Sequence, residues 1–134
     1  MSDVKQVIIM RKDLKNTKGE KVRSGKIIAQ GCHASMKVFF DRMERVEDDW
    51  RSIQLTYEMQ VWMDGIFTKV CLQVGSEEEL VEIYNKAKEA ELPCALIEDS
   101  GLTEFGGVKT KTCMAIGPAN SEDIDKISGH LKLF

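Results

Sequence analysis

The sequence predicts one α/β domain over residues 1–134, built on a mixed, mostly parallel four-stranded sheet with helices on both faces. Four short apolar segments typical of strands alternate with segments whose apolar residues recur every three or four positions, in the order β-α-α-β-α-β-β-α. Helices between strands favour parallel neighbours, because a crossover returns the chain to the same end of the sheet. A chain of 134 residues is also the right size for one core.

Four segments carry the strand signal. Residues 4–11, VKQVIIMR, contain a nearly continuous apolar run that suits the centre of a sheet. The other three predicted strands are residues 67–74, 94–98 and 111–117. Loops with glycines separate them from their neighbours, which supports these boundaries.

Helical spacing predicts four helices. From Lys26 to about Val46, apolar residues recur on one face that we expect to meet the core, with Ser24 as the N-terminal cap; they are Ile28, Cys32, Met36, Phe39, Met43 and Val46. A second helix within residues 47–65 is expected to turn four residues toward the core, namely Trp50, Ile53, Tyr57 and Trp62. Ser76 and Glu79 form a capping box for the third, and Asn120 or Ser121 caps the last.

Composition excludes several classes of protein. Hydrophobic residues make up 43% and charged residues 31% of the chain, as in soluble globular proteins. No apolar run reaches the roughly 18 residues of a membrane span, and the N-terminus lacks a secretory pattern, so we expect a cytoplasmic protein. The four cysteines match no zinc spacing, and we expect reduced core residues without a metal; they are Cys32, Cys71, Cys94 and Cys113.

The first 26 residues are basic although the chain as a whole has a net charge of −3. They hold eight lysines and arginines against three acidic residues, 8 − 3 = +5. A polyanion could bind this segment, whereas charge alone favours a solvated lysine-rich loop. The candidate contacts are Arg11, Lys12, Lys15, Lys18, Lys21 and Arg23.

The segment GKIIAQGCHAS (25–35) places a polar stripe on the first helix. At 100° per residue, Lys26, Gln30, His33 and Lys37 fall within an arc of about 60°, roughly opposite the apolar face. Small residues flank this stripe, including Gly31, which costs about 1 kcal/mol relative to alanine inside a helix. From the helix alone, a solvent-exposed face is the favoured interpretation.

A second candidate lies in EDSGLTEF, directly after the third strand. Ligands of open α/β sheets bind at the carboxyl ends of strands, where Asp99 could orient a water or position a lysine. Thr103 could donate its hydroxyl. The alternative is an Asp turn followed by a glycine hinge. Thr112 enters the last strand, where threonine is common.

Six segments occur in order along the chain: MRKDLK, GKIIAQGCHAS, GSEEEL, LIEDSGLTEF, KTCMAIGP and ISGHLKLF. Together they resemble the type 2 peptidyl-tRNA hydrolases of archaea and eukaryotes. This resemblance implies a mixed four-stranded α/β domain, often homodimeric, that acts in translation. It implies hydrolysis of the ester between a peptide and the 3′ end of tRNA, without a metal or other cofactor. Motif positions carry the site to Lys26, Gln30, His33, Asp99, Thr103 and Thr112.

These residue types can perform that chemistry. We expect Asp99 to hold Lys26 and help orient a water, while Lys26 stabilises the developing oxyanion with donors from Thr103 and Gln30. The basic residues of the N-terminal segment would contact tRNA phosphates. Departures from the family pattern at Leu102 and Glu104 leave two alternatives open. One is a catalytically weak RNA-binding or protein-interaction module, and the other is a hydrolase of small aminoacyl or peptidyl esters.

Overall fold

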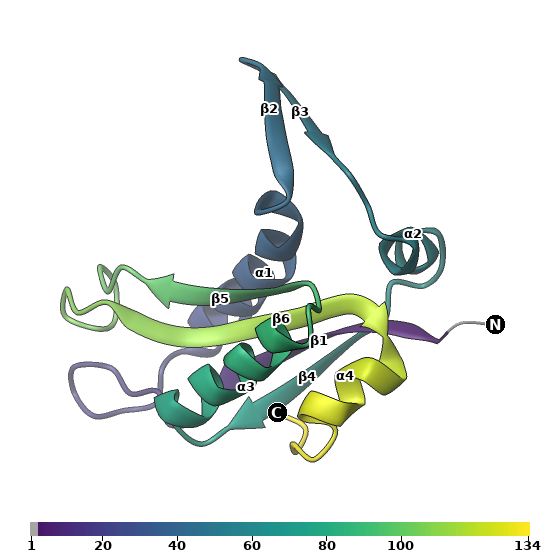
Figure 1. The fold of residues 1–134 in the computed structure, drawn as a ribbon. Coiled ribbons are helices and arrows are strands. Elements are labelled where there is room, and N and C mark those ends of the chain that lie inside the picture. Colours follow the sequence, from purple (N-terminus) through teal and green to yellow (C-terminus); the bar gives the residue numbers. More distant parts are fainter. Residues whose placement is uncertain (1–2) are drawn as a thin grey trace.

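The central sheet has the strand order β4-β1-β6-β5, and a separate two-stranded hairpin is formed by β2 and β3. Figure 1 shows this sheet with helices on both sides and the hairpin projecting away from it. The computed structural model describes residues 3–134. Its elements are β1 (Val4–Arg11), α1 (Ser24–Phe40), β2 (Met43–Glu47), β3 (Trp50–Ile53), α2 (Tyr57–Asp64), β4 (Lys69–Val74), α3 (Glu77–Glu89), β5 (Cys94–Asp99), β6 (Thr110–Asn120) and α4 (Ser121–Ser128).

The predicted mixed four-stranded sheet is confirmed, and its strand directions refine the prediction. β1 pairs in parallel with β4, whereas β6 is antiparallel to both β1 and β5. Three of the four strands therefore run in the same direction, but only one of the three pairings is parallel. The reason is the short connection from β5 to β6, which is a hairpin loop and too short for a crossover.

Both faces of the sheet are covered, as predicted. On one face α1 and α2 pack through Ala34, Val38 and Met59. On the other face α3 and α4 pack through Leu80 and Ile124. The alternation of side chains along each strand supplies both cores, because successive residues point to opposite faces.

The prediction of a helix up to about Val46 and a second one from residue 47 was wrong in part. α1 ends at Phe40, and residues 43–53 form the exposed β2–β3 hairpin before α2 begins at Tyr57. Trp50 and Tyr57 are exposed, whereas Trp62 is buried, as predicted. The strands of this hairpin pair Met43 with Ile53, so the apolar residues that continued the helical spacing also fit a hairpin.

The predicted buried face of α1 was also wrong, except at Phe39, which packs against the core. The helix turns Gln30, Ala34 and Val38 to the sheet, whereas Ile28 is 66% exposed. The small Ala34 lets α1 lie close to the strands, which a face of larger side chains would prevent. Ser24 is the first helical residue and not the cap; Arg23 occupies the cap position.

The predicted caps of the last two helices are confirmed. The Ser76 hydroxyl accepts from the Glu79 backbone N–H at 3.1 Å, which starts α3. Asn120 caps α4 by accepting from the Glu122 N–H at 2.9 Å. These side chains satisfy N–H groups that a helix start otherwise leaves unpaired.

The cysteines are free, as predicted, but they do not all belong to the core. Cys113 is buried and Cys94 half-buried, whereas Cys32 and Cys71 are exposed. Cys32 was predicted to be buried because it lies on the face of α1 that was wrongly expected to meet the core. Cys71 lies on β4, at one edge of the sheet.

The C-terminal tail covers the outer edge of β4. Leu133 bridges to Leu72, the Gln73 N–H donates to the Lys132 carbonyl at 3.0 Å, and the Phe134 N–H donates to the Cys71 carbonyl at 3.0 Å. One edge of the sheet is thus closed by the chain itself. Among residues 3–134, no helix has the length and apolar character needed to cross a membrane.

Candidate active site

An ion pair joins the start of α1 to the end of β5. The Lys26 Nζ lies 2.9 Å from Asp99 Oδ1, and their side chains are only 11% and 12% exposed. Lys26 stands in the first turn of α1, and Asp99 is the last residue of β5. The packing of α1 on the sheet therefore brings two segments together that the sequence analysis had singled out separately.

The loop after β5 holds the second oxygen of Asp99. The Gly101 backbone N–H donates to Oδ2 at 2.9 Å. Gly101 has φ +83°, and a Cβ at this position would lie 2.2 Å from the Val108 carbonyl oxygen. Only glycine fits this close approach, so Gly101 serves the geometry of the site directly.

Asp99 is held as a carboxylate. Burial acts to raise the pKa of Asp99, but the hydrogen bonds from Lys26 and Gly101, with the Lys26 charge and the Gln30 amide, lower it below the ordinary value of 3.8. A carboxylate that accepts several hydrogen bonds favours its charged form. Asp99 therefore acts as an anion at neutral pH and is a weak proton acceptor.

Gln30 connects this ion pair to the core. Its Nε2 donates to Asp99 Oδ1 at 3.2 Å, and its Oε1 accepts from the Thr112 hydroxyl at 2.5 Å. Gln30 is 2% and Thr112 is 0% exposed, so both are enclosed by protein. The Cys113 thiol also approaches the Gln30 carbonyl at 3.2 Å. Gln30 thus holds Asp99, and Thr112 holds Gln30, and neither side chain faces the solvent.

Thr103 completes the surroundings of the lysine. Its Oγ1 accepts from Lys26 Nζ at 2.8 Å, and Thr103 itself is exposed. The Phe105 ring lies beneath the ammonium group, 5.8 Å from centroid to Nζ. A lysine ammonium has three N–H donors, of which Asp99 and Thr103 take two. The third is available to a substrate oxygen.

His33 lies apart from this hydrogen-bonded group. It is exposed, and within residues 3–134 its side chain makes no hydrogen bond or ion pair with the other five predicted site residues. It lines a groove between α1 and β5 instead. Lys37, which shares the predicted stripe, pairs with Asp41 at 2.8 Å.

Glu104 has a structural partner that the sequence did not reveal. Its carboxylate pairs with the Arg23 guanidinium and accepts from the Arg23 backbone N–H at 3.3 Å. Leu102, two residues earlier, is 84% exposed. Glu104 thus binds the cap position of α1, close to Lys26. Only the opposite charges of the two residues hinted at this contact.

The six basic residues proposed for tRNA binding differ in their surroundings. Arg11 pairs with Asp13 at 2.8 Å, and Lys12 lies 4.0 Å above the Phe134 ring. The other three lysines are exposed in the loop between β1 and α1 and form no ion pair within the described range; they are Lys15, Lys18 and Lys21.

This basic loop packs beside the loop that carries Thr103. A Cβ on Gly106 would lie 2.9 Å from the Thr17 methyl group. Between the two loops lies a hollow of about 350 Å³, with Lys15, Phe105 and Thr110 in its lining. The basic loop therefore lies beside the loop whose Thr103 binds Lys26.

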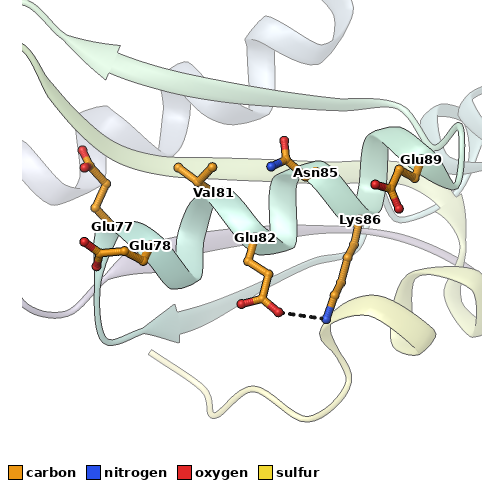
Figure 2. Close-up of a pocket in the computed structure, with 7 residues that line it drawn as sticks. All are labelled: Glu77, Glu78, Val81, Glu82, Asn85, Lys86 and Glu89. Atoms are coloured by element: carbon orange, nitrogen blue, oxygen red, sulfur yellow. Dashed lines mark ion pairs between the residues drawn. The ribbon is translucent and has the colours of Figure 1, made fainter.

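The outer face of α3 differs sharply in charge. Figure 2 shows a shallow hollow along α3, whose side chains point outward and include four glutamates. One of these, Glu82, pairs with Lys86 at 3.2 Å. These carboxylates would repel a polyanion. Over residues 3–134, no group of three or more histidines, cysteines, aspartates or glutamates is arranged to hold a metal ion.

Comparison with known proteins gives one consistent result. The family model described as peptidyl-tRNA hydrolase PTH2 matches residues 4–134. A peptidyl-tRNA hydrolase of Methanocaldococcus jannaschii is 41% identical over 133 residues, which cover 97% of this chain and 99% of that protein. A peptidyl-tRNA hydrolase of Methanothermobacter thermautotrophicus is 42% identical over 130 residues, covering 97% and 99%. One of Halobacterium salinarum is 40% identical over 131 residues, covering 98% and 100%.

Proposed function

The chain belongs to the PTH2 family of peptidyl-tRNA hydrolases, and from this premise we propose that residues 1–134 act as one hydrolase domain with its active site at Lys26 and Asp99. The family resemblance seen in the sequence is confirmed, and the chain is a hydrolase by its family. The single observation that carries the assignment of the site is the shielded pair of Lys26 and Asp99, flanked by Thr103 and Gln30.

The reaction cleaves an ester with water. Water adds to the carbonyl carbon, the bond from this carbon to the 3′ oxygen of tRNA breaks, and the products are a peptide carboxylate, a tRNA hydroxyl and a proton. In our proposal, the free N–H of Lys26 binds the carbonyl oxygen as negative charge develops there. The Thr103 hydroxyl, exposed beside Lys26, can donate to the same oxygen or to the attacking water.

Asp99 acts mainly by holding Lys26 in this proposal. Its low pKa makes the carboxylate a poor general base. Its charge fixes the ammonium group, and the Gln30–Thr112 hydrogen bond fixes Asp99 in turn. Lys26 and Thr103 would therefore meet the substrate, whereas Gln30 and Thr112 are positioning residues. His33 lies along the helix toward the groove, where a bound substrate would pass it.

Charge favours one direction of approach for tRNA. Lys15, Lys18 and Lys21 are exposed in the loop that packs beside the Thr103 loop, while the outer face of α3 carries glutamates. Arg11, Lys12 and Arg23 add positive charge but have internal partners, and Arg11 also lies within the electrostatic influence of Glu77 and Glu78 at the start of α3. Phosphates would thus be drawn to the end that holds Lys26 and repelled from α3.

The direct test is hydrolysis of N-acetylaminoacyl-tRNA by the purified protein. We expect release of the N-acetylamino acid both with and without a chelator. Acid precipitation of the labelled tRNA measures this release. Turnover that disappears with the chelator would contradict the proposed role of Lys26 as the main group that stabilises the oxyanion. No turnover above that of Lys26→Ala would contradict the proposed function.

The tRNA-binding surface needs a separate test. Replacing Lys15, Lys18 and Lys21 by Glu should weaken tRNA binding and flatten the plot of log affinity against log salt by roughly two to three units. The matched control replaces Lys86, Lys88 and Lys126, which are exposed on the other face. Equal effects of the two triple variants would remove the basic loop from the binding surface.

We propose further that a second copy of the chain covers an apolar face formed by α1, β1 and β4. A groove of about 450 Å³ lies there, lined by Ile8, Ile28, Cys32, Met36, Cys71 and Phe134 among others. An exposed apolar surface of this kind is typical of an interface. Gly31 also lines this groove, and a Cβ there would meet only Ile8, at 3.7 Å. The packing of this chain does not require that glycine, whereas a second chain could approach closely there.

Oligomeric state can be measured by sedimentation or light scattering. We expect a dimer that Ile28→Glu separates into monomers, while the control Ile66→Glu, at an 85% exposed position, leaves it intact. A wild-type monomer at micromolar concentration would contradict this interface.

The four free cysteines agree with our proposal of a cytoplasmic location, where thiols stay reduced.

A further inference from the structure

One edge of the central sheet is paired by the chain itself and the other is not. The C-terminal tail pairs with β4 through residues 132–134, whereas β5 is the other edge and pairs only with β6. Alternate residues of an antiparallel strand direct their N–H and C=O groups away from the partner. Within residues 3–134, no backbone group pairs with that outer side of β5. An extended chain could therefore add there.

A groove runs along this free edge. It has a volume of about 390 Å³, and on one side it is lined by residues of α1 and its C-terminal cap: His33, Met36, Lys37, Phe40 and Asp41. On the other side it is lined by Leu96, Ile97 and Glu98 of β5. Leu96 packs with the core of α3 and α4, while Ile97 packs with the core of α1 and α2. Because both line one groove, the groove follows the backbone of the strand edge.

Both walls of the groove adjoin the proposed active site along the chain. Asp99 follows Glu98 directly on β5, and Gln30, which binds Asp99, precedes His33 by one helical turn on α1. A molecule in the groove would therefore continue to Lys26 and Asp99. The occupant of the groove should therefore be the part of the substrate that extends from the ester.

We propose that the groove binds the peptide moiety of peptidyl-tRNA as an extended strand parallel to β5. The inference rests on the proposed function, since the ester must lie at Lys26 and Asp99. A peptide is esterified through its C-terminus, so its chain runs toward Asp99, and β5 also runs from Cys94 to Asp99. Pairing through the backbone does not select side chains, so peptides of different sequence would fit.

Charge favours a peptide over RNA in this groove. Its lining contains the carboxylates of Asp41 and Glu98 against the single lysine Lys37, which is already paired with Asp41 at 2.8 Å. Glu98 lies 3.9 Å from Lys111. The remaining side chains include the apolar Met36 and Phe40. Each of the two carboxylates thus has a lysine partner, and no excess of positive charge remains to attract a phosphate, whereas an uncharged peptide backbone needs none.

The groove sets a length for the bound peptide. Three residues of β5 line it, and an extended chain rises about 3.3 Å per residue. The groove therefore holds about three peptide residues. We expect kcat/KM to rise with peptide length up to about three or four residues and then to stay constant.

The experiment compares N-acetylaminoacyl-tRNA with tetrapeptidyl-tRNA of the same tRNA and the same C-terminal residue. We expect about a tenfold higher kcat/KM for the longer substrate, mainly through KM, as two or so backbone hydrogen bonds would give. N-methylation of one of two successive peptide amides should abolish this gain and N-methylation of the other should not. This alternation is specific to strand pairing.

A variant of the groove supports the substrate comparison. Phe40→Ala should lower the ratio of the two kcat/KM values, whereas Tyr57→Ala, at a similarly exposed aromatic on α2, should not. If Phe40→Ala lowers kcat/KM equally for both substrates, the groove would be assigned to tRNA, and the proposal that it binds the peptide would be overturned. Hydrolysis of both substrates at one rate would overturn the peptide path alone. Hydrolysis of neither would overturn the proposed function and the inference with it.

Discussion

The Nζ of Lys26 lies 2.9 Å from the Oδ1 of Asp99, although 73 positions separate the two residues in the chain. The start of α1 and the end of β5 meet at this point because α1 packs across the sheet. Each residue satisfies the charge of the other in a poorly solvated place, where an unpaired charge would be costly. The pair is therefore both a structural link and the centre of the proposed site.

Lys26→Ala should lower kcat for N-acetylaminoacyl-tRNA by about 10²–10³-fold, the usual effect of removing one oxyanion donor. Hydrolysis rates under single-turnover conditions measure this. Lys86→Ala, on the outer face of α3, is the control and should keep the wild-type rate. A loss that appears only in KM would assign Lys26 to substrate binding instead.

The lowered pKa of Asp99 should make the free energy of unfolding depend on pH. The pKa of Asp99 in the folded protein lies below 3.8, so its stabilising contribution is present above about pH 4 and is lost as the pH falls through the folded pKa. Asp99→Asn should therefore be less stable than wild type by on the order of 1–3 kcal/mol at pH 7. Urea unfolding should show this difference shrinking below pH 4. A difference that is constant from pH 7 to pH 3 would contradict the assignment.

Thr112 should act through Gln30. Thr112→Val removes the hydroxyl that donates to Gln30 Oε1 and leaves this buried oxygen unpaired, at about 1–3 kcal/mol of folding free energy. We expect kcat to fall with it, because Gln30 no longer fixes Asp99. Thr112→Ser keeps the hydroxyl and should recover most of the rate. Loss of stability in Thr112→Val without loss of kcat would mean a structural role alone.

The cysteines should differ in reactivity with a disulfide reagent at pH 8. Cys32 and Cys71 are exposed on the single chain. Because the proposed dimer would cover them, the labelling uses the monomeric variant Ile28→Glu, in which they should react first. Burial raises the pKa of Cys94 and, for Cys113, raises the pKa to about 12. Because the thiolate is the reactive form, Cys113 should react only after unfolding. Mass spectrometry of the labelled protein resolves the order, and early labelling of Cys113 would contradict the buried position.

Local patterns predicted most elements of the fold. The apolar run of β1, the capping box at Ser76 and the cap at Asn120 are signals within a few residues, and the structure confirms them. The hairpin of residues 43–53 was missed because its apolar residues also fit a helical spacing. Hydrophobicity could not identify the buried face of α1, since the sheet accepts the small Ala34 and the polar Gln30 there.

Local sequence patterns specify the chemical groups of this protein: a lysine and a glutamine one turn apart on a helix, an aspartate at a strand end and a threonine in the loop after it. Which of these groups meet depends on the tertiary structure. Thr112 on β6 orients Gln30, Gln30 holds Asp99, and Arg23 pairs with Glu104, while His33 lies outside this group. The physical reason is that the pairing of β5 with β6 and the packing of α1 on the sheet depend on the whole core, which no local pattern records.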